Sequence, residues 1–284
     1  MKQFAQKLEN NYDGYNALSS YYHEKHENAT LDKQLMLVFP SWVQGNLCAS
    51  ISAILSTLKQ EYKGIKVRCP NQRLLNFFMS NGFYEKCVNV NPDDAKFFNR
   101  KTSIKYNQFR LNQIDEFIQY INEELPRNLF PQTSDKAWEK LKECIAEVFI
   151  NATQHSKSDL VFACGQHFPQ KERLDFSIVD SGIGFKQRLF LSREMQLSSL
   201  EAIDWCMIPG NTTKQGAPGG GGLDLLSKFI QYNNGKLQIV SSDGFYECSQ
   251  KGIIRKFLDH AFPGTIFNLE IDTSDQQRYK LTTE

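Results

Sequence analysis

Two different orders of apolar segments constrain what this sequence can fold into more than any other feature. The first order, from residue 35 onward, is strand, helix, strand, helix. Its segments are "LMLVFP", "VQGNLCASISAILSTLKQEYKG", "IKVRCP" and "NQRLLNFFMSNGF". Such a βαβα order predicts a small parallel sheet with helices packed on it.

The second order predicts an α+β sandwich in the rest of the chain. Amphipathic helices are expected in "LNQIDEFIQYINEEL", "SDKAWEKLKECIAEVFINATQHS" and "GLDLLSKFIQYNNG", the second of them opened by Ser134 or Asp135 as N-cap. Strands are expected in "LVFACGQHF", "RLDFSIVD", "KLQIVSSD" and "GTIFNLEI". Pairs of strands separated by helices favour a mixed sheet covered by helices on one face. We therefore expect an α+β fold.

The length of the chain fits two domains. It has 284 residues, and one domain usually takes about 100–200. The polar stretch 91–107 is the best candidate for the boundary, which divides the chain into domains 1–100 and 101–284. Hydrophobic residues make up 40% of the sequence, enough for a packed core in each domain.

Charge and cysteine usage indicate a cytoplasmic protein. The formal net charge of +1 gives no reason to expect binding to nucleic acid or to an anionic membrane. The seven cysteines are scattered without CxxC pairs, as is usual for small core side chains in a reducing compartment. No window approaches the roughly 18 apolar residues of a membrane span.

The stretch "SIVDSGIGF" places a carboxylate, Asp180, where a strand is expected to end, followed by Gly182, Ile183 and Gly184. One interpretation is a plain turn, since Asp and Gly are common turn residues. The other is a ligand pocket whose floor accepts a hydrogen bond while the backbone comes close to the ligand.

On the expected helix 134–156, Glu147 and Asn151 stand one turn apart beside an apolar stripe. A solvated pair on the helix surface is one interpretation. In the other, both side chains face one cleft. There the Asn151 amide oxygen would bind Mg²⁺ together with substrate phosphates, and Glu147 would deprotonate an attacking water.

Four consecutive glycines, at 219–222, lead into the next expected helix. They could form a flexible linker, or leave backbone N–H groups free to hold phosphate oxygens at a helix N-terminus. The segment is neither a Walker A loop, which needs GxxxxGK[ST], nor a Rossmann fingerprint, which needs a strand directly before it.

The order of these motifs resembles the GHKL superfamily, the Bergerat-fold ATPases and kinases that include DNA gyrase, ninety-kilodalton heat-shock chaperones, MutL and the histidine kinases. The resemblance covers roughly residues 134–272 and ends with Gly264-Thr265. It implies that Asp180 accepts a hydrogen bond from the adenine amine, with a water that Thr265 helps to hold. It also implies that Gly182 and Gly184 let the backbone approach the base.

The same resemblance implies the remaining site. Asn151 would hold Mg²⁺, and Glu147 would be the catalytic base. The phosphates would lie at Gly220, Gly222 and Leu223, and the γ-phosphate would be reached by Thr213 and Lys214 when a lid formed by residues 206–222 closes.

Two features depart from the family pattern. Asp224 replaces a glycine in "GGGLDL", so the start of the helix could be shaped differently or repel an anion. The chain also offers no phosphoacceptor histidine on a dimerising helix. His155, on the same helix face as Asn151, is expected to have a structural role.

The segment "GIKVRCPNQRLLNFFMSNGF" resembles a STAS domain, the regulatory fold of anti-sigma-factor antagonists. That family implies a phosphorylatable serine at the start of the first helix. Gly45 and Asn46 stand near that place, and Ser50 is expected inside the helix, which argues against a phosphorylation switch here.

Together these features predict an ATP·Mg²⁺-binding GHKL protein that hydrolyses ATP slowly and whose nucleotide state controls the docking of a protein partner. The alternatives are an anti-sigma-type serine/threonine kinase and a nucleotide-sensing module without chemistry. A homodimer is compatible with the resemblance.

Overall fold

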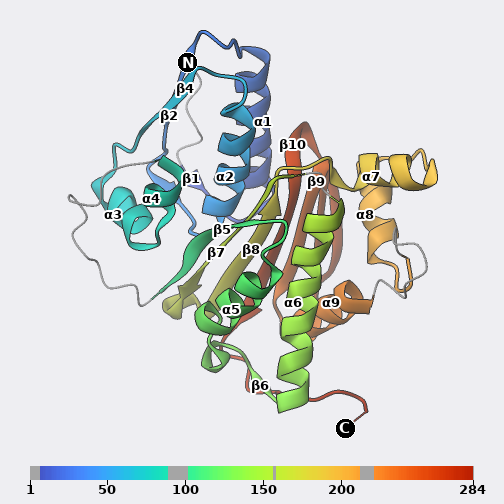
Figure 1. The fold of residues 1–284 in the computed structure, drawn as a ribbon. Coiled ribbons are helices and arrows are strands. Elements are labelled where there is room, and N and C mark those ends of the chain that lie inside the picture. Colours follow the sequence, from blue (N-terminus) through green and yellow to red (C-terminus); the bar gives the residue numbers. More distant parts are fainter. Residues whose placement is uncertain (1–6, 89–101, 156–157, 212–220, 284) are drawn as a thin grey trace.

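The structure is a computed structural model that describes residues 7–88, 102–155, 158–211 and 221–283. Most of the expected boundary stretch 91–107 lies outside these residues. The described part is a mixed α+β fold built on one five-stranded sheet (Figure 1).

The sheet is antiparallel throughout, with the strand order β5-β7-β8-β10-β9. Its strands are β5 (Ser103–Arg110), β7 (Leu160–Phe168), β8 (Arg173–Asp180), β9 (Lys236–Ser249) and β10 (Gly252–Asp272). The expected mixed sheet is therefore wrong. Each described neighbouring pair runs antiparallel because β7 and β8 form one hairpin, β9 and β10 form a second, and β10 then pairs with β8.

Strands β7 and β8 begin and end where the sequence predicts, whereas β9 and β10 are longer. The extra residues form a hairpin, 244–262, that extends beyond the rest of the sheet. Its ladder is irregular between Phe257 and Phe262 and again before Thr265. Thr265 then lies opposite Asp180 of β8, which brings two residues of the GHKL-like pattern side by side.

Three amphipathic helices cover one face of the sheet (Figure 1): α5 (Ile114–Glu124), α6 (Asp135–His155) and α9 (Gly221–Tyr232). They confirm the three helices expected in this part of the chain. Ser134 caps α6, because its Oγ accepts a hydrogen bond from the backbone N–H of Ala137 at 3.1 Å. The apolar stripe of α6 packs onto side chains of β8 and β10 such as Ile178 and Phe267.

The expected βαβα order before residue 88 is confirmed. Its elements are β2 (Gln34–Val38), α2 (Leu47–Leu58), β4 (Gly64–Arg68) and α3 (Gln72–Ser80), followed by α4 (Phe83–Val88). Strands β2 and β4 form a two-stranded parallel sheet. A further helix, α1 (Tyr12–Glu27), and the short parallel strands β1 (Lys7–Leu8) and β3 (Trp42–Val43) precede or interrupt this order.

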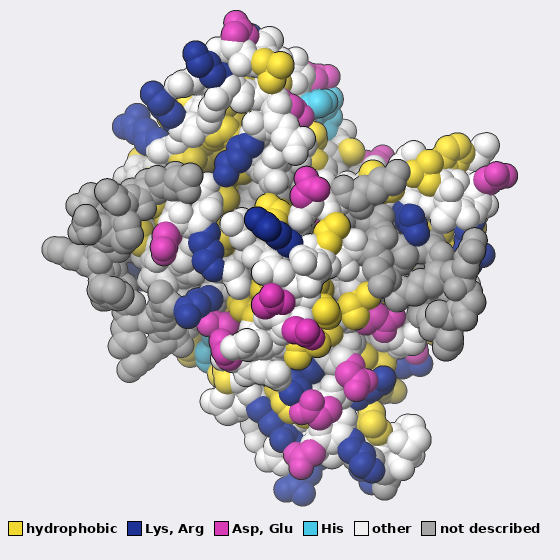
Figure 2. Space-filling model, in the orientation of Figure 1, with side chains coloured by type: hydrophobic (Ala, Val, Ile, Leu, Met, Phe, Trp, Pro, Cys, Tyr) yellow, Lys and Arg dark blue, Asp and Glu magenta, His cyan; other side chains and the backbone are white. Residues whose placement is uncertain are grey.

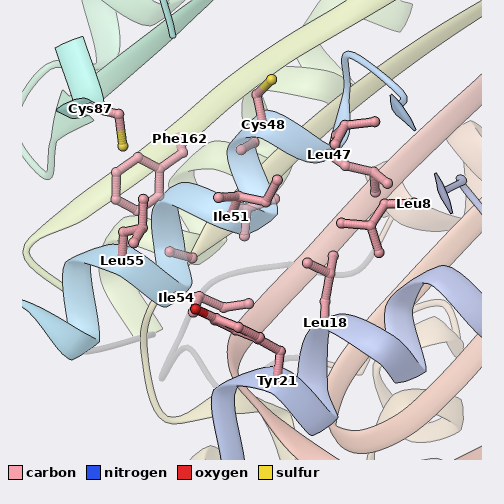
Figure 3. Packing of buried hydrophobic residues seen from close by; sticks show 14 of the residues in the cluster. Leu8, Leu18, Tyr21, Leu47, Cys48, Ile51, Ile54, Leu55, Cys87 and Phe162 are labelled. Atoms are coloured by element: carbon pink, nitrogen blue, oxygen red, sulfur yellow. The ribbon is translucent and has the colours of Figure 1, made fainter. Parts of the chain in front are cut away.

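Helices α1 and α2 pack against the other face of the five-stranded sheet, so both faces are covered. Figure 3 shows Leu18 of α1 and Ile51 of α2 in one apolar cluster with Phe162 of β7. Val179 of β8 and Ile266 of β10 belong to the same cluster. The N-terminal part and the sheet thus share a hydrophobic core.

Polar side chains are buried between α2 and the sheet. Asn46, just before α2, donates hydrogen bonds from Nδ2 to Asn268 Oδ1 at 2.9 Å and to Ser177 Oγ at 3.2 Å. All three residues are inaccessible to solvent. Because buried polar groups need partners, this contact favours one position of α2 over the sheet.

Two helices that the sequence did not predict, α7 (Gly184–Arg193) and α8 (Ser199–Met207), pack beside β9 (Figure 1). Ser198 and Glu201 form a capping box at the start of α8, with hydrogen bonds of 3.3 and 2.7 Å. The remaining elements of the described residues are two short 3₁₀ turns and a parallel strand pair: Arg127–Leu129, Pro169–Lys171, β6 (Gln132–Thr133) and β11 (Arg278–Tyr279).

Candidate functional site

A small pocket of about 20 Å³ lies where the end of β8 meets β10, between α6 and α7. This volume holds about one water molecule and is well below the range for small-molecule sites. Four of the residues expected to bind a ligand line it: Asn151, Asp180, Gly184 and Thr265. The other lining residues are Ala152, Phe185, Arg188 and Phe267.

Asp180 is the buried carboxyl of this pocket, with 3% of its surface exposed. Its Oδ1 accepts a hydrogen bond from the backbone N–H of Gly182 at 2.8 Å, and the backbone of Thr265 also donates to the carboxyl. Burial raises the pKa of Asp180 from 3.8 to about 7, although both hydrogen bonds act in the opposite direction. Near neutral pH the group can therefore act as an acceptor or hold a proton.

The Asp-Ser-Gly-Ile-Gly segment is a turn and also part of the pocket, so its two interpretations are compatible. Gly184 has a φ of +71°, and a Cβ atom there would lie 2.9 Å from Ser241 Oγ. That hydroxyl accepts a hydrogen bond from the backbone N–H of Phe185 at 2.9 Å. Gly184 therefore lets the chain turn tightly against β9, while Ile183, half-buried, precedes α7.

Gly264 allows the same closeness on the opposite strand. Its φ is +145°, and a Cβ atom at this position would collide with the carbonyl oxygen of Asp180. Thr265, the next residue, is 3% exposed, and its Oγ1 lies 3.4 Å from Ser241 Oγ. The Gly-Thr pair thus holds β10 against the end of β8 and places a hydroxyl beside the pocket.

Glu147 and Asn151 of α6 take different places. Asn151 lines the pocket, whereas the carboxylate of Glu147, which is half-buried, lies against Gly222 in the first turn of α9. Asn151 is thus at the pocket, and Glu147, one turn earlier on α6, is at the start of α9. Glu147 is not among the described residues that line the pocket, so its place in a common cleft with Asn151 stays a prediction.

The glycine-rich segment is described only at its end. Gly222 and Leu223 are buried in the first turn of α9. Asp224 is turned along the helix, where its Oδ2 accepts a hydrogen bond from Lys228 Nζ at 2.7 Å. That ion pair partly neutralises the charge that departs from the family pattern. The remaining expected residues lie outside the described part: Thr213, Lys214, Gly220, the central part of the lid 206–222, and the side chain of His155.

Sequence reasoning missed three side chains that form pocket walls: Phe185, Arg188 and Phe267. A signal existed for Phe267, because it lies two residues after Thr265 and strand residues two apart share a face. Phe185 and Arg188 could be placed only by recognising that a helix begins at Gly184. The rings of Phe185 and Phe267 make an edge contact with centroids 5.9 Å apart, giving the pocket an apolar side.

Within the described ranges, no cluster of three or more His, Cys, Asp or Glu side chains could by itself hold a metal ion. The helices described here are all too short or too polar to cross a membrane. Figure 2 shows acidic and basic side chains of described residues interspersed on the face that carries α5 and α6. All seven cysteines are free, and five are buried, as expected for core side chains.

No protein-family model matches the chain, and no curated protein matches it at a significant level. We therefore infer the function from the residues of the pocket and from their arrangement.

Proposed function

We propose that this chain is an ATP·Mg²⁺-binding protein of the GHKL type that binds adenine in the pocket at Asp180 and hydrolyses ATP slowly. In this proposal residues 101–284 form a Bergerat-type sandwich, and the βαβα part before them is STAS-like. The observation that carries it is the meeting of Asn151, Asp180, Gly184 and Thr265 at one pocket from three separate stretches of sequence.

The side chains of the pocket suit an adenine ring, but the walls of this pocket of about 20 Å³ would have to move apart to admit one. Apolar walls, including Phe185 and Phe267, suit a flat heteroaromatic ligand, and Asp180 supplies a buried acceptor at one end. A carboxylate has about four acceptor sites, and Gly182 and Thr265 donate to two of them, so sites remain for a ligand donor. The adenine amine is such a donor, whereas guanine carries the O6 acceptor at the same ring position.

Two residues of α6 would carry out the remaining steps: Asn151 would bind the metal ion, and Glu147 would act as the catalytic base. Asn151 supplies the amide oxygen that suits Mg²⁺, an ion that binds through few protein groups together with phosphates and waters. When bound, Mg²⁺ would neutralise charge on the phosphates. Glu147 of α6, which lies against Gly222 at the start of α9, would take a proton from the water that attacks the γ-phosphate, and this reaction would release ADP and phosphate.

The fold also offers a route by which nucleotide binding could affect partner docking. Asp180 and Thr265 face the pocket, whereas their neighbours Val179 and Ile266 belong to the apolar cluster shared with α1 and α2. Adjacent strand residues point to opposite faces, so a shift of these strand ends would change the packing on both faces of the sheet. We therefore propose that the nucleotide state alters a protein-binding surface in the N-terminal part.

Calorimetric titration with ATP, ADP and GTP, with and without Mg²⁺, tests the proposal. Wild-type protein should bind ATP and ADP in preference to GTP, and Asp180→Asn should lose this binding because it puts an amide N–H₂ opposite the adenine amine. Asp175→Asn is the matched control, since Asp175 is also buried with a pKa raised to about 7 but lies on the opposite face of β8. Absence of adenine-nucleotide binding by the wild type would contradict the proposal.

Two further assays separate the alternatives. Transfer of ³²P from labelled ATP to a purified STAS-like protein would favour the anti-sigma-type kinase. Intact ATP after hours in a single-turnover experiment, despite tight binding, would favour a sensing module without chemistry.

A further inference from the structure

The described residues that line the pocket include one cation, Arg188, which does not belong to the GHKL-like pattern. Arg188 of α7 lines the pocket together with Asp180, and it stands one helical turn after Gly184. Residues four apart on a helix share a face, so the turn that places Gly184 at the pocket also places Arg188 there.

The Nε–H group of Arg188 is buried and has no hydrogen-bond acceptor among the described residues. Among the other arginines, Arg127 Nη1 lies 2.7 Å from Asp135 Oδ1 and Arg255 Nε lies 2.8 Å from Asp204 Oδ1, whereas Arg173 Nε also lacks an acceptor. A buried donor of a charged group without an acceptor is costly in free energy. An acceptor that enters the pocket would remove this cost.

Asp180 does not serve as that acceptor. No ion pair within 4.0 Å joins the two side chains in the described part of the chain, and Arg188 is not among the groups that alter the pKa of Asp180. The pocket thus presents an acceptor, the Asp180 carboxyl, and a separate donor, Arg188. A ligand that satisfies both must carry a hydrogen-bond donor and, at another position, an acceptor atom.

We propose that Arg188 is a ligand-contacting specificity residue whose guanidinium donates a hydrogen bond to an acceptor atom of the bound adenine nucleotide. This inference rests on the proposed function and adds a second point of recognition to it. The acceptor belongs either to the base and ribose or to a phosphate, and the two sources predict different results for adenosine and for its phosphates. Arginine suits either source because its planar fork donates to ring nitrogens and phosphate oxygens alike.

The test is calorimetric titration of adenosine, AMP and ATP·Mg²⁺ into wild type, Arg188→Gln, Arg188→Lys and Lys186→Gln at fixed ionic strength. Lys186→Gln is the control, since it removes a positive charge from the exposed side of the same helix. Arg188→Gln should weaken binding about tenfold or more, as expected for a lost hydrogen bond from a charged group. Lys186→Gln should stay within about twofold of wild type, which allows for screened long-range charge effects.

The arms of the experiment identify the acceptor. Equal weakening of all three ligands would place it on the base or ribose, and weakening of AMP and ATP alone would place it on a phosphate. Arg188→Lys keeps the positive charge but lacks the planar guanidinium, so its ligand affinities should lie between those of wild type and Arg188→Gln. If Arg188→Gln does not fold, Arg188→Lys serves as the test variant.

Wild-type affinities for all three ligands in both Arg188 variants would overturn the inference and leave the proposed function standing. Failure of the wild type to bind any of the three would overturn both.

Discussion

Replacement of Asp180 by Asn should make the stability of the protein less dependent on pH. Between about pH 4 and pH 7 the folded protein keeps a proton on this buried carboxyl that the unfolded chain has lost, because the folded pKa is about 7 and the ordinary value is 3.8. The stability that this group contributes is therefore fully present below about pH 4 and is lost as pH rises through 7. The pKa difference corresponds to about 4 kcal/mol.

Asparagine at this position has no charge to bury. Its oxygen can still accept the hydrogen bond from the Gly182 N–H, but its amide N–H₂ lacks a partner in the empty pocket, at a cost of about 1–3 kcal/mol. We therefore expect Asp180→Asn to be less stable than wild type near pH 4 and to equal or exceed it at pH 8. The difference in unfolding free energy should change by up to about 4 kcal/mol over this range.

Urea denaturation of both proteins at pH 4.5, 6, 7 and 8 measures this difference, provided that the denaturant slope is unchanged. Asp175 also has a pKa near 7, but it is present in both proteins, so its contribution cancels in the comparison. A difference between the two proteins that stays constant from pH 4.5 to pH 8 would refute the argument from the buried charge.

Two other predictions concern the start of α9 and the contact between α2 and the sheet. Glu147→Ala should lower phosphate release about a hundredfold or more at nearly unchanged ATP affinity. Gly222→Ala should also lower phosphate release, because its Cβ would displace the Glu147 carboxylate. Unchanged turnover in Glu147→Ala would remove this residue from the mechanism. Asn46→Ala should lower the free energy of unfolding by about 1–3 kcal/mol, because Asn268 and Ser177 lose a buried partner; a loss below about 0.5 kcal/mol in urea denaturation would contradict the role given to this contact.

The sequence predicted well those elements whose apolar pattern is strong. Strand β7 opens with an unbroken apolar run, β8 largely alternates apolar and polar residues, and the apolar residues of α6 recur with the helical period. The bounds of all three agree with the prediction to within about a residue. Helix α1 was missed because its buried face includes Gly14 and Ser19 besides tyrosines, which gives only a weak apolar stripe. The hairpin extension of β10 was missed because residues 252–257 are exposed on both sides and show no alternation.

The residues of the candidate site also fall into two groups, those that local sequence signals predict and those that packing between distant segments places. Asp180, Asn151 and Thr265 could be proposed from motif order, because the turn and helix signals around them are local. Arg188 could not, since its place depends on α7, which has little amphipathic pattern. The separate position of Glu147 at Gly222 also follows from the packing of α6 on α9, a contact between segments more than seventy residues apart.

The central claim is that Asp180 recognises the amino group of adenine. The most direct test is titration of wild type and Asp180→Asn with ATP and with purine riboside triphosphate, an analogue that lacks only the 6-amino group. Wild type should prefer ATP by about tenfold or more, and Asp180→Asn should bind the two ligands with similar, weak affinity. Equal affinity of the wild type for ATP and the analogue, or a preference for ATP that persists in Asp180→Asn, would contradict the claim.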